Sequence, residues 1–91
     1  DLLAAAVLEE AAAAGFSVPD ELAVVGATGL ALAEHTTPPL TVLEQPMEAL
    51  GREAGRLALD LIRSGGAALP GRYVFSPLVA RVSCPVPPGF E

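Results

Sequence analysis

The apolar stretch "LAVVGATG", residues 22–29, constrains the fold of this chain more than any other feature. A short run of consecutive apolar residues predicts a parallel strand that is covered on both faces. The strand runs into Gly26 and Gly29, as strands do before a phosphate-binding loop. Because strands of open α/β sheets also end in this way beside other ligand clefts, the turn alone leaves open an enzyme and a binding module.

An alanine-rich helix is predicted before this strand. Residues 2–14, "LLAAAVLEEAAAA", combine high helix propensity with no helix breaker, and Gly15 predicts the end of the helix. Asp1 is a suitable N-cap residue, because its carboxylate can accept hydrogen bonds from the first free N–H groups. Leu3 and Val7 form an apolar stripe on this helix. Helix, loop and strand make half of a βαβ unit, so we expect its first strand to precede Asp1 in a longer protein.

The downstream segments continue an α/β pattern. One helical turn is expected at residues 30–34, since the prolines that follow preclude a longer helix, and "LTVLEQ", residues 40–45, is expected to be extended. A helix is predicted from Pro46 to the stop at Ser64-Gly65-Gly66, and short strands are expected at residues 73–76 and 78–83. The expected core face of the second helix consists of Met47, Leu50, Ala54, Leu57, Ala58 and Leu61.

Composition and charge exclude several functions for this stretch of 91 residues. Its net charge is -6, with five arginines and no lysine, whereas non-specific DNA binding requires clusters of cations. The apolar run "LLAAAVL" is far shorter than the roughly 20 residues of a membrane-spanning helix. A single cysteine, Cys84, cannot form an internal disulfide or, by itself, a metal site. We therefore expect no metal, no cofactor and no membrane contact.

The dinucleotide interpretation of the glycine turn fits poorly. A Rossmann fingerprint has a third glycine where this chain has Leu32, and it continues into a helix, whereas Pro38 follows Gly29 after only about nine residues. We interpret the turn as a strand end that opens toward a ligand cleft. Thr28 has a hydroxyl that can donate and accept, so it is placed either to reach such a ligand or to cap the turn that follows.

Three longer stretches together resemble one protein family. They are "DLLAAAVLEEAAAAGFSVPDELAVVGATG", "PPLTVLEQPMEALGREAGRLALDLI" and "PLVARVS". In order and spacing, they are similar to the C-terminal part of the effector-binding domain of LacI/GalR-family transcriptional regulators. The matching positions include Asp1, Gly15, Pro19, Gly26, Pro38, Pro39, Leu40, Thr41, Gln45, Pro46, Arg81 and Ser83.

The resemblance implies an α/β fold of the type I periplasmic-binding-protein-like kind, in which two Rossmann-like subdomains joined by crossing hinge strands close on a small molecule. Residues 1–37 would end the C-terminal subdomain with a helix, a strand and an interface loop. Residues 38–45 would form a hinge-crossing strand, 46–76 a helix and a strand of the N-terminal subdomain, and 77–91 a returning strand and tail. The helix-turn-helix that reads DNA would lie upstream of this chain.

The resemblance also implies functional residues. The family commonly has an aromatic residue and then an Asp after Val-Val-Gly, and this chain has Ala27 and Thr28 there. Because a threonine offers one hydroxyl where a carboxylate can accept two, a less polyhydroxylated or shifted effector is expected. Thr28 and Gln45 are the predicted effector-binding residues. The predicted dimer interface consists of Ala5, Leu8, Ala12, Leu32, His35, Thr36 and Thr37, although the helix among them could equally pack on its own sheet.

The sequence therefore predicts a non-enzymatic, cytoplasmic sensor module that binds a sugar-like effector and belongs to a homodimeric DNA-binding transcriptional regulator. Two alternatives remain. A periplasmic sugar-binding protein of an importer would be favoured by an upstream signal peptide. An enzyme fragment that binds NAD(P) through "VVGATG" would require saturable NAD(P) binding by the complete protein.

Overall fold

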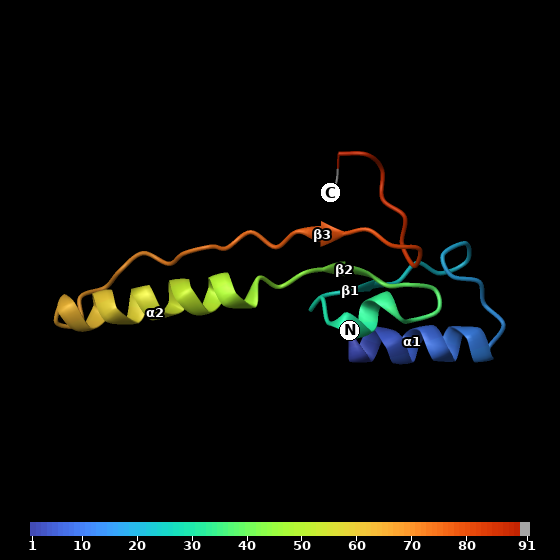
Figure 1. Ribbon diagram of the computed structural model, residues 1–91, viewed down its shortest axis with the longest axis horizontal. Helices are drawn as coiled ribbons and strands as arrows, with labels where there is room; N and C mark the ends of the chain where they lie inside the picture. The colour runs from blue at the N-terminus through green and yellow to red at the C-terminus, as the bar shows by residue number, and fades with distance from the viewer. Residues whose placement is uncertain (90–91) are drawn as a thin grey trace. The chain divides into compact units, whose positions relative to one another are not determined.

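The computed structural model describes residues 1–89, which form two compact units (Figure 1). Unit 1 comprises Asp1–Gln45 and the segment from Ser76 onward, and unit 2 comprises Pro46–Phe75. The last two residues of the predicted tail, 90 and 91, lie outside the described residues. The elements in chain order are α1 (Leu2–Ala13), β1 (Val25–Gly26), the 3-10 turn η1 (Ala31–Glu34), β2 (Thr41–Leu43), α2 (Met47–Arg63) and β3 (Leu78–Val79).

Unit 1 is built on a three-stranded mixed sheet with the order β1-β2-β3. β1 pairs in parallel with β2, with Val25 opposite Thr41, and β2 pairs antiparallel with β3, with Val42 opposite Val79. Because β2 is central, Thr41 and Val42 are fully buried, as is Leu40 before them. The strand within residues 38–45 is thus an internal part of unit 1, and the chain passes to unit 2 after Gln45.

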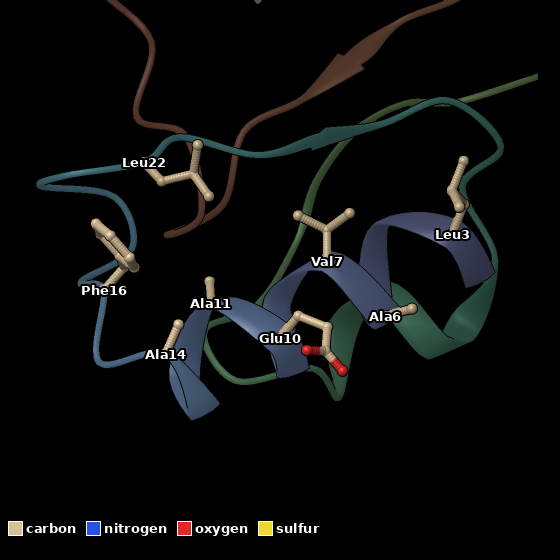
Figure 2. A pocket seen from close by; sticks show the side chains of 8 residues that line it. All are labelled: Leu3, Ala6, Val7, Glu10, Ala11, Ala14, Phe16 and Leu22. Carbon is tan, nitrogen blue, oxygen red and sulfur yellow. The ribbon is translucent and has the colours of Figure 1, made fainter.

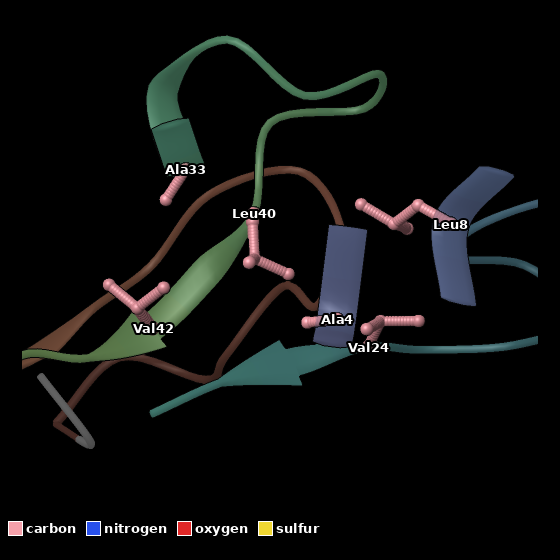
Figure 3. Packing of buried hydrophobic residues seen from close by; sticks show 6 residues of the cluster. All are labelled: Ala4, Leu8, Val24, Ala33, Leu40 and Val42. Atoms are coloured by element: carbon pink, nitrogen blue, oxygen red, sulfur yellow. The ribbon is translucent and has the colours of Figure 1, made fainter. Parts of the chain in front are cut away.

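Helix α1 packs on the sheet through small residues. Its buried side chains are Ala4, Leu8 and Ala11, which recur at helical spacing, whereas Leu3 is 81% exposed. The apolar stripe of Leu3 and Val7 lies outside this buried set, because both side chains are exposed. Half of the residues of α1 are alanine, which leaves little contrast between its faces, so the sequence pattern does not select the buried face. Figure 3 shows the resulting core cluster of Ala4, Leu8, Val24, Ala33, Leu40 and Val42.

Strand β1 is covered on one face only. Val24 and Gly26 are buried, but Val25 between them is 48% exposed. The prediction of a strand covered on both faces is thus wrong for the described residues: Val24 packs in the core cluster with Ala4 and Leu8 of α1, whereas the side chain of Val25 is left open. The predicted helix end is confirmed: α1 stops before Gly15, whose φ of +81° is the left-handed conformation that favours glycine.

A buried polar junction ties the returning chain to this sheet. The hydroxyl of Ser83 is fully buried, accepts a hydrogen bond from the Thr41 N–H at 2.8 Å and donates to the carbonyl of Val24 at 2.6 Å. The backbone of Ser83 adds two bonds, from the Val24 N–H at 3.0 Å and to the Pro39 carbonyl at 2.9 Å. Ser83 therefore joins the segments that lead into both parallel strands.

The side chains of Thr41 and Arg81 complete this junction. The Thr41 hydroxyl accepts a hydrogen bond from the Arg81 N–H at 2.8 Å and lies 2.8 Å from the carbonyl oxygen of Cys84. The Arg81 guanidinium donates to the carbonyl of Leu40 at 2.8 Å. These contacts give a physical reason for the Thr, Arg and Ser of the "PPLT" and "ARVS" motifs, because each satisfies a backbone group that would otherwise be buried without a partner.

Unit 2 consists of α2 and the extended segment after it. The predicted surface pairs form, between Glu48 and Arg52 and between Glu53 and Arg56, and Arg72 of the extended segment pairs with Glu53 at 3.0 Å. No residue of α2 is buried, so the predicted core face is open in this unit. The strand expected at residues 73–76 does not form, since the described part of unit 2 offers no second strand for pairing.

Among the described residues, no helix has both the length and the apolar character needed to cross a membrane.

Candidate ligand-binding site

The structure brings the two predicted effector-binding residues together at one edge of the unit 1 sheet. Thr28 follows β1 and Gln45 follows β2, and because these strands are parallel, their carboxyl ends lie at the same edge. The N–H of Gln45 donates a hydrogen bond of 3.0 Å to the carbonyl oxygen of Thr28. Thr28 is half-buried and Gln45 is exposed, so the edge presents a hydroxyl and a carboxamide that can each donate and accept.

The Asp1 carboxylate sits on the turn that carries Thr28. Its Oδ1 accepts a hydrogen bond from the Thr28 N–H at 3.0 Å, and its Oδ2 accepts from the N–H groups of Gly29 at 2.8 Å and Leu30 at 2.6 Å. Asp1 is the N-cap residue of α1, but its side chain makes no capping bond to the helix. The expected capping bond is therefore wrong, because the carboxylate binds the converging N–H groups of the turn instead.

Close packing explains why the turn has glycine at positions 26 and 29. A Cβ on Gly26 would lie 2.6 Å from Asp1 Oδ1 and 2.9 Å from a methyl group of Leu40. Gly29 has a φ of +85°, and a Cβ there would lie 2.7 Å from Cγ of Glu44. Gly26 thus makes room for the Asp1 carboxylate, which occupies the backbone N–H groups that a phosphate-binding loop would direct at its ligand.

The seven predicted interface residues line one hollow of about 350 Å³, together with Glu9. Side chains of α1 form one wall, and the segment that includes η1 forms the other. The Thr36 hydroxyl lies 2.9 Å from the Pro38 carbonyl oxygen, which holds the bend of this second wall. Leu8 is 3% exposed and belongs to the core cluster, so it also packs within unit 1 as the alternative interpretation had it.

A second hollow of about 470 Å³ has a different character (Figure 2). Leu3, Val7 and Ala11 line it from α1, and Phe16 and Leu22 line it from the segment that follows, with the carboxylate of Glu10 as its charged group. A sugar requires several convergent hydrogen-bonding groups, which this apolar surface does not supply. The hollow therefore does not suit a polar ligand.

Within residues 1–89, no group of three or more His, Cys, Asp or Glu side chains is arranged to hold a metal ion. Sequence reasoning missed the contact of Asp1 with the turn. The sequence indicates a helix cap and a family match at Asp1, but no local signal connects position 1 with positions 28–30.

The carboxyl edge of parallel strands is where open α/β proteins commonly bind their ligands, and Thr28 and Gln45 lie at this edge. The family model of the periplasmic binding protein-like domain matches residues 1–84. The chain belongs to this family, and the predicted α/β fold class is confirmed.

Within this family, the chain is similar to LacI-family transcriptional regulators, as the sequence motifs predicted. It is 43% identical over 74 residues to the HTH-type transcriptional regulator CelR of Thermobifida fusca, covering 81% of this chain and 22% of that protein. It is 37% identical over 91 residues to the HTH-type transcriptional regulator MalR of Streptomyces coelicolor, covering 98% of this chain and 26% of that protein. These relatives are named as regulators and not as enzymes.

Solved structures give the same result. A complex of the transcriptional regulator CelR with cellobiose matches with a TM-score of 0.74 and 41% identity, over 90% of this chain and 25% of that one. A LacI-family regulator from Arthrobacter sp. FB24 in complex with lactose matches with a TM-score of 0.71 and 31% identity, over 92% of this chain and 33% of that one. The chain thus spans between 22% and 33% of the length of these proteins.

Proposed function

We propose that this chain is part of the effector-sensing domain of a DNA-binding transcriptional regulator in the cytoplasm. The effector in this proposal is a sugar-like small molecule. Support comes from the regulators to which the chain is similar, two of which have structures with the disaccharides cellobiose and lactose. The helix-turn-helix that contacts DNA belongs to another part of the protein, because the net charge of -6 makes this stretch unsuited to a phosphate backbone.

The effector contacts that we propose are Thr28 and Gln45. The observation that carries this assignment is their position at one edge of two parallel strands, with a 3.0 Å hydrogen bond from the Gln45 N–H to the Thr28 carbonyl. That bond uses backbone atoms, so the hydroxyl and the carboxamide keep their hydrogen-bonding capacity for a ligand. Since neither side chain is charged, they suit the hydroxyl groups of a neutral sugar.

In this proposal, the sensor works by a change in the arrangement of two subdomains. Residues 1–37 end one subdomain, and residues 46–76 contribute a helix to the other. Residues 38–45 lead out to that second subdomain, and the segment 77–89 leads back. Effector binding favours one arrangement, and DNA affinity changes because that arrangement sets the spacing of the DNA-reading heads.

Self-association is the third part of the proposal. The hollow between α1 and the segment from Leu32 to Thr37 would receive the same surface of a second copy, as a two-fold symmetric interface requires. Small residues such as Ala5 and Ala12 permit close helix approach, and the exposed Leu32 would supply apolar contact area. DNA binding by two heads then follows from a homodimer.

The test is sugar binding by the full-length protein. Isothermal titration with cellobiose and lactose should show saturable binding of at least one of them, and Thr28→Ala and Gln45→Ala should each weaken it about five- to tenfold, as expected for the loss of one neutral hydrogen bond. Ser17→Ala, which removes an exposed hydroxyl from a residue of neither the sheet edge nor the hollow, is the control and should leave the affinity unchanged. Wild-type affinity in both edge variants would show that the effector binds elsewhere.

A parallel titration with NAD(P) tests the enzyme alternative. We expect no saturation, because the Asp1 carboxylate already accepts hydrogen bonds from the N–H groups of Thr28, Gly29 and Leu30. A negative charge at this position would also repel a pyrophosphate. Saturable NAD(P) binding that is lost in Gly26→Ala would overturn the sensor interpretation.

A further inference from the structure

The Asp1 carboxylate holds the backbone turn at the proposed effector edge through three hydrogen bonds. Oδ1 binds the Thr28 N–H, and Oδ2 binds the N–H groups of Gly29 and Leu30, at distances between 2.6 and 3.0 Å. Hydrogen bonds to an ionised acceptor are roughly twice as strong as those between neutral groups. Both oxygens of one carboxylate are therefore committed to a single turn.

This turn has few other contacts that would fix its conformation. Leu30 is exposed, and Thr28 and Gly29 are only half-buried, so burial of apolar side chains contributes little. Two other backbone hydrogen bonds, each of 3.0 Å, hold the turn: the Thr28 carbonyl accepts from the Gln45 N–H, and the Leu30 carbonyl accepts from the Ala33 N–H. Asp1 and Gln45 thus hold the two peptide groups that flank Thr28, one through N–H and one through C=O.

We propose that Asp1 is a positioning residue of the effector site. Its carboxylate fixes the turn Thr28–Leu30 and thereby sets where the Thr28 hydroxyl stands relative to the Gln45 side chain. This inference rests on the proposed function for its meaning, but the contact itself exists without a ligand. Gly26 is part of the same arrangement, because a Cβ there would lie 2.6 Å from Asp1 Oδ1.

The experiment uses two variants of the full-length protein, Asp1→Asn and Asp1→Ser. The Asp1 side chain makes no capping bond to α1, so neither replacement removes a cap from the helix, and both new residues are accepted at N-cap positions. Neither can present two anionic oxygens to the turn. Asp20→Asn makes the same chemical change at an exposed position and is the matched control.

Amide hydrogen exchange is the first measurement. We expect the N–H groups of Thr28, Gly29 and Leu30 to exchange at least tenfold faster in both Asp1 variants than in the wild type. The N–H groups of Val24 and Thr41 report on the fold, because they are bonded in the buried junction, and they should keep wild-type protection. Unchanged exchange in the turn would overturn the proposal, and so would equal acceleration at Val24 and Thr41, which indicates general destabilisation.

Sugar affinity is the second measurement, by titration with cellobiose and with lactose. Whichever of them the wild type binds, both Asp1 variants should bind it about tenfold more weakly, while Asp20→Asn binds it like the wild type. A loosened turn with unchanged affinity would overturn the positioning role. If the wild type binds neither sugar, the proposed effector class is wrong. Hydrogen exchange still decides whether Asp1 holds the turn, so a failure of the proposed function and a failure of the Asp1 contact can be told apart.

Discussion

Substitution of Ser83 by alanine should destabilise the protein far more than the loss of one small side chain suggests. The hydroxyl accepts from the Thr41 N–H at 2.8 Å and donates to the Val24 carbonyl at 2.6 Å, and both Ser83 and Thr41 are fully buried. Ser83→Ala therefore leaves a buried N–H without its partner and weakens the bonding of a buried carbonyl. Each unsatisfied group costs about 1–3 kcal/mol, so we expect the free energy of unfolding to fall by roughly 2–4 kcal/mol.

The assay is urea unfolding of the full-length protein, with hydrogen exchange at the Thr41 and Val24 amides to locate the change. Ser76→Ala is the matched control, because Ser76 is exposed, and its effect should stay within about 0.5 kcal/mol. The exchange rates should rise at both amides in Ser83→Ala and remain unchanged in Ser76→Ala. A loss below about 0.5 kcal/mol for Ser83→Ala would refute the view that this junction anchors the returning chain.

Three further predictions concern other parts of the chain. Gly26→Ala should lower stability by about 1–3 kcal/mol in a thermal melt, because of its 2.6 Å approach to the Asp1 carboxylate, whereas Gly51→Ala, in the open interior of α2, should raise it by about 0.5–1 kcal/mol. Leu32→Glu should weaken self-association at least tenfold in sedimentation equilibrium, and an unchanged dimer would exclude this hollow as the interface. The hydrogen bond from Arg72, and after it the one from Arg56, holds the pKa of Glu53 below its ordinary 4.5. The contribution of these contacts to folding stability is therefore present at neutral pH and is lost as the pH falls through the lowered pKa. In Arg72→Gln, the NMR titration midpoint of Glu53 should move upward.

Local sequence chemistry predicted much of the element order. The glycine at position 15 ends α1, the prolines after the glycine turn limit the next helix to the 3-10 turn Ala31–Glu34, and Ser64 with the glycines after it ends α2. In each case, the glycine, proline or serine lies within a few residues of the helix end that it determines. The strand expected at residues 73–76 failed because strand formation depends on a partner and not on the segment alone.

The candidate site was predicted in part. The sequence placed Thr28 and Gln45 at the ends of two strands, and the parallel pairing of β1 with β2 brings those ends to one edge. The interface residues were predicted from a family resemblance, and they line one hollow, but Leu8 among them is largely committed to the core. Whether these residues bind an effector or a second copy stays a prediction that the experiments above test.

The sequence by itself determined the family, the α/β class and the positions at which helices and turns begin and end, because these depend on motifs and on short-range backbone preferences. Only the tertiary structure decided which face of α1 is buried, since a run of alanines gives neither face an advantage. It also decided that Asp1 binds a turn 27 residues away and that Ser83 satisfies Thr41 from 42 residues away. Such contacts depend on how the strands pair, and that pairing brings together polar groups whose separation along the chain carries no local signal.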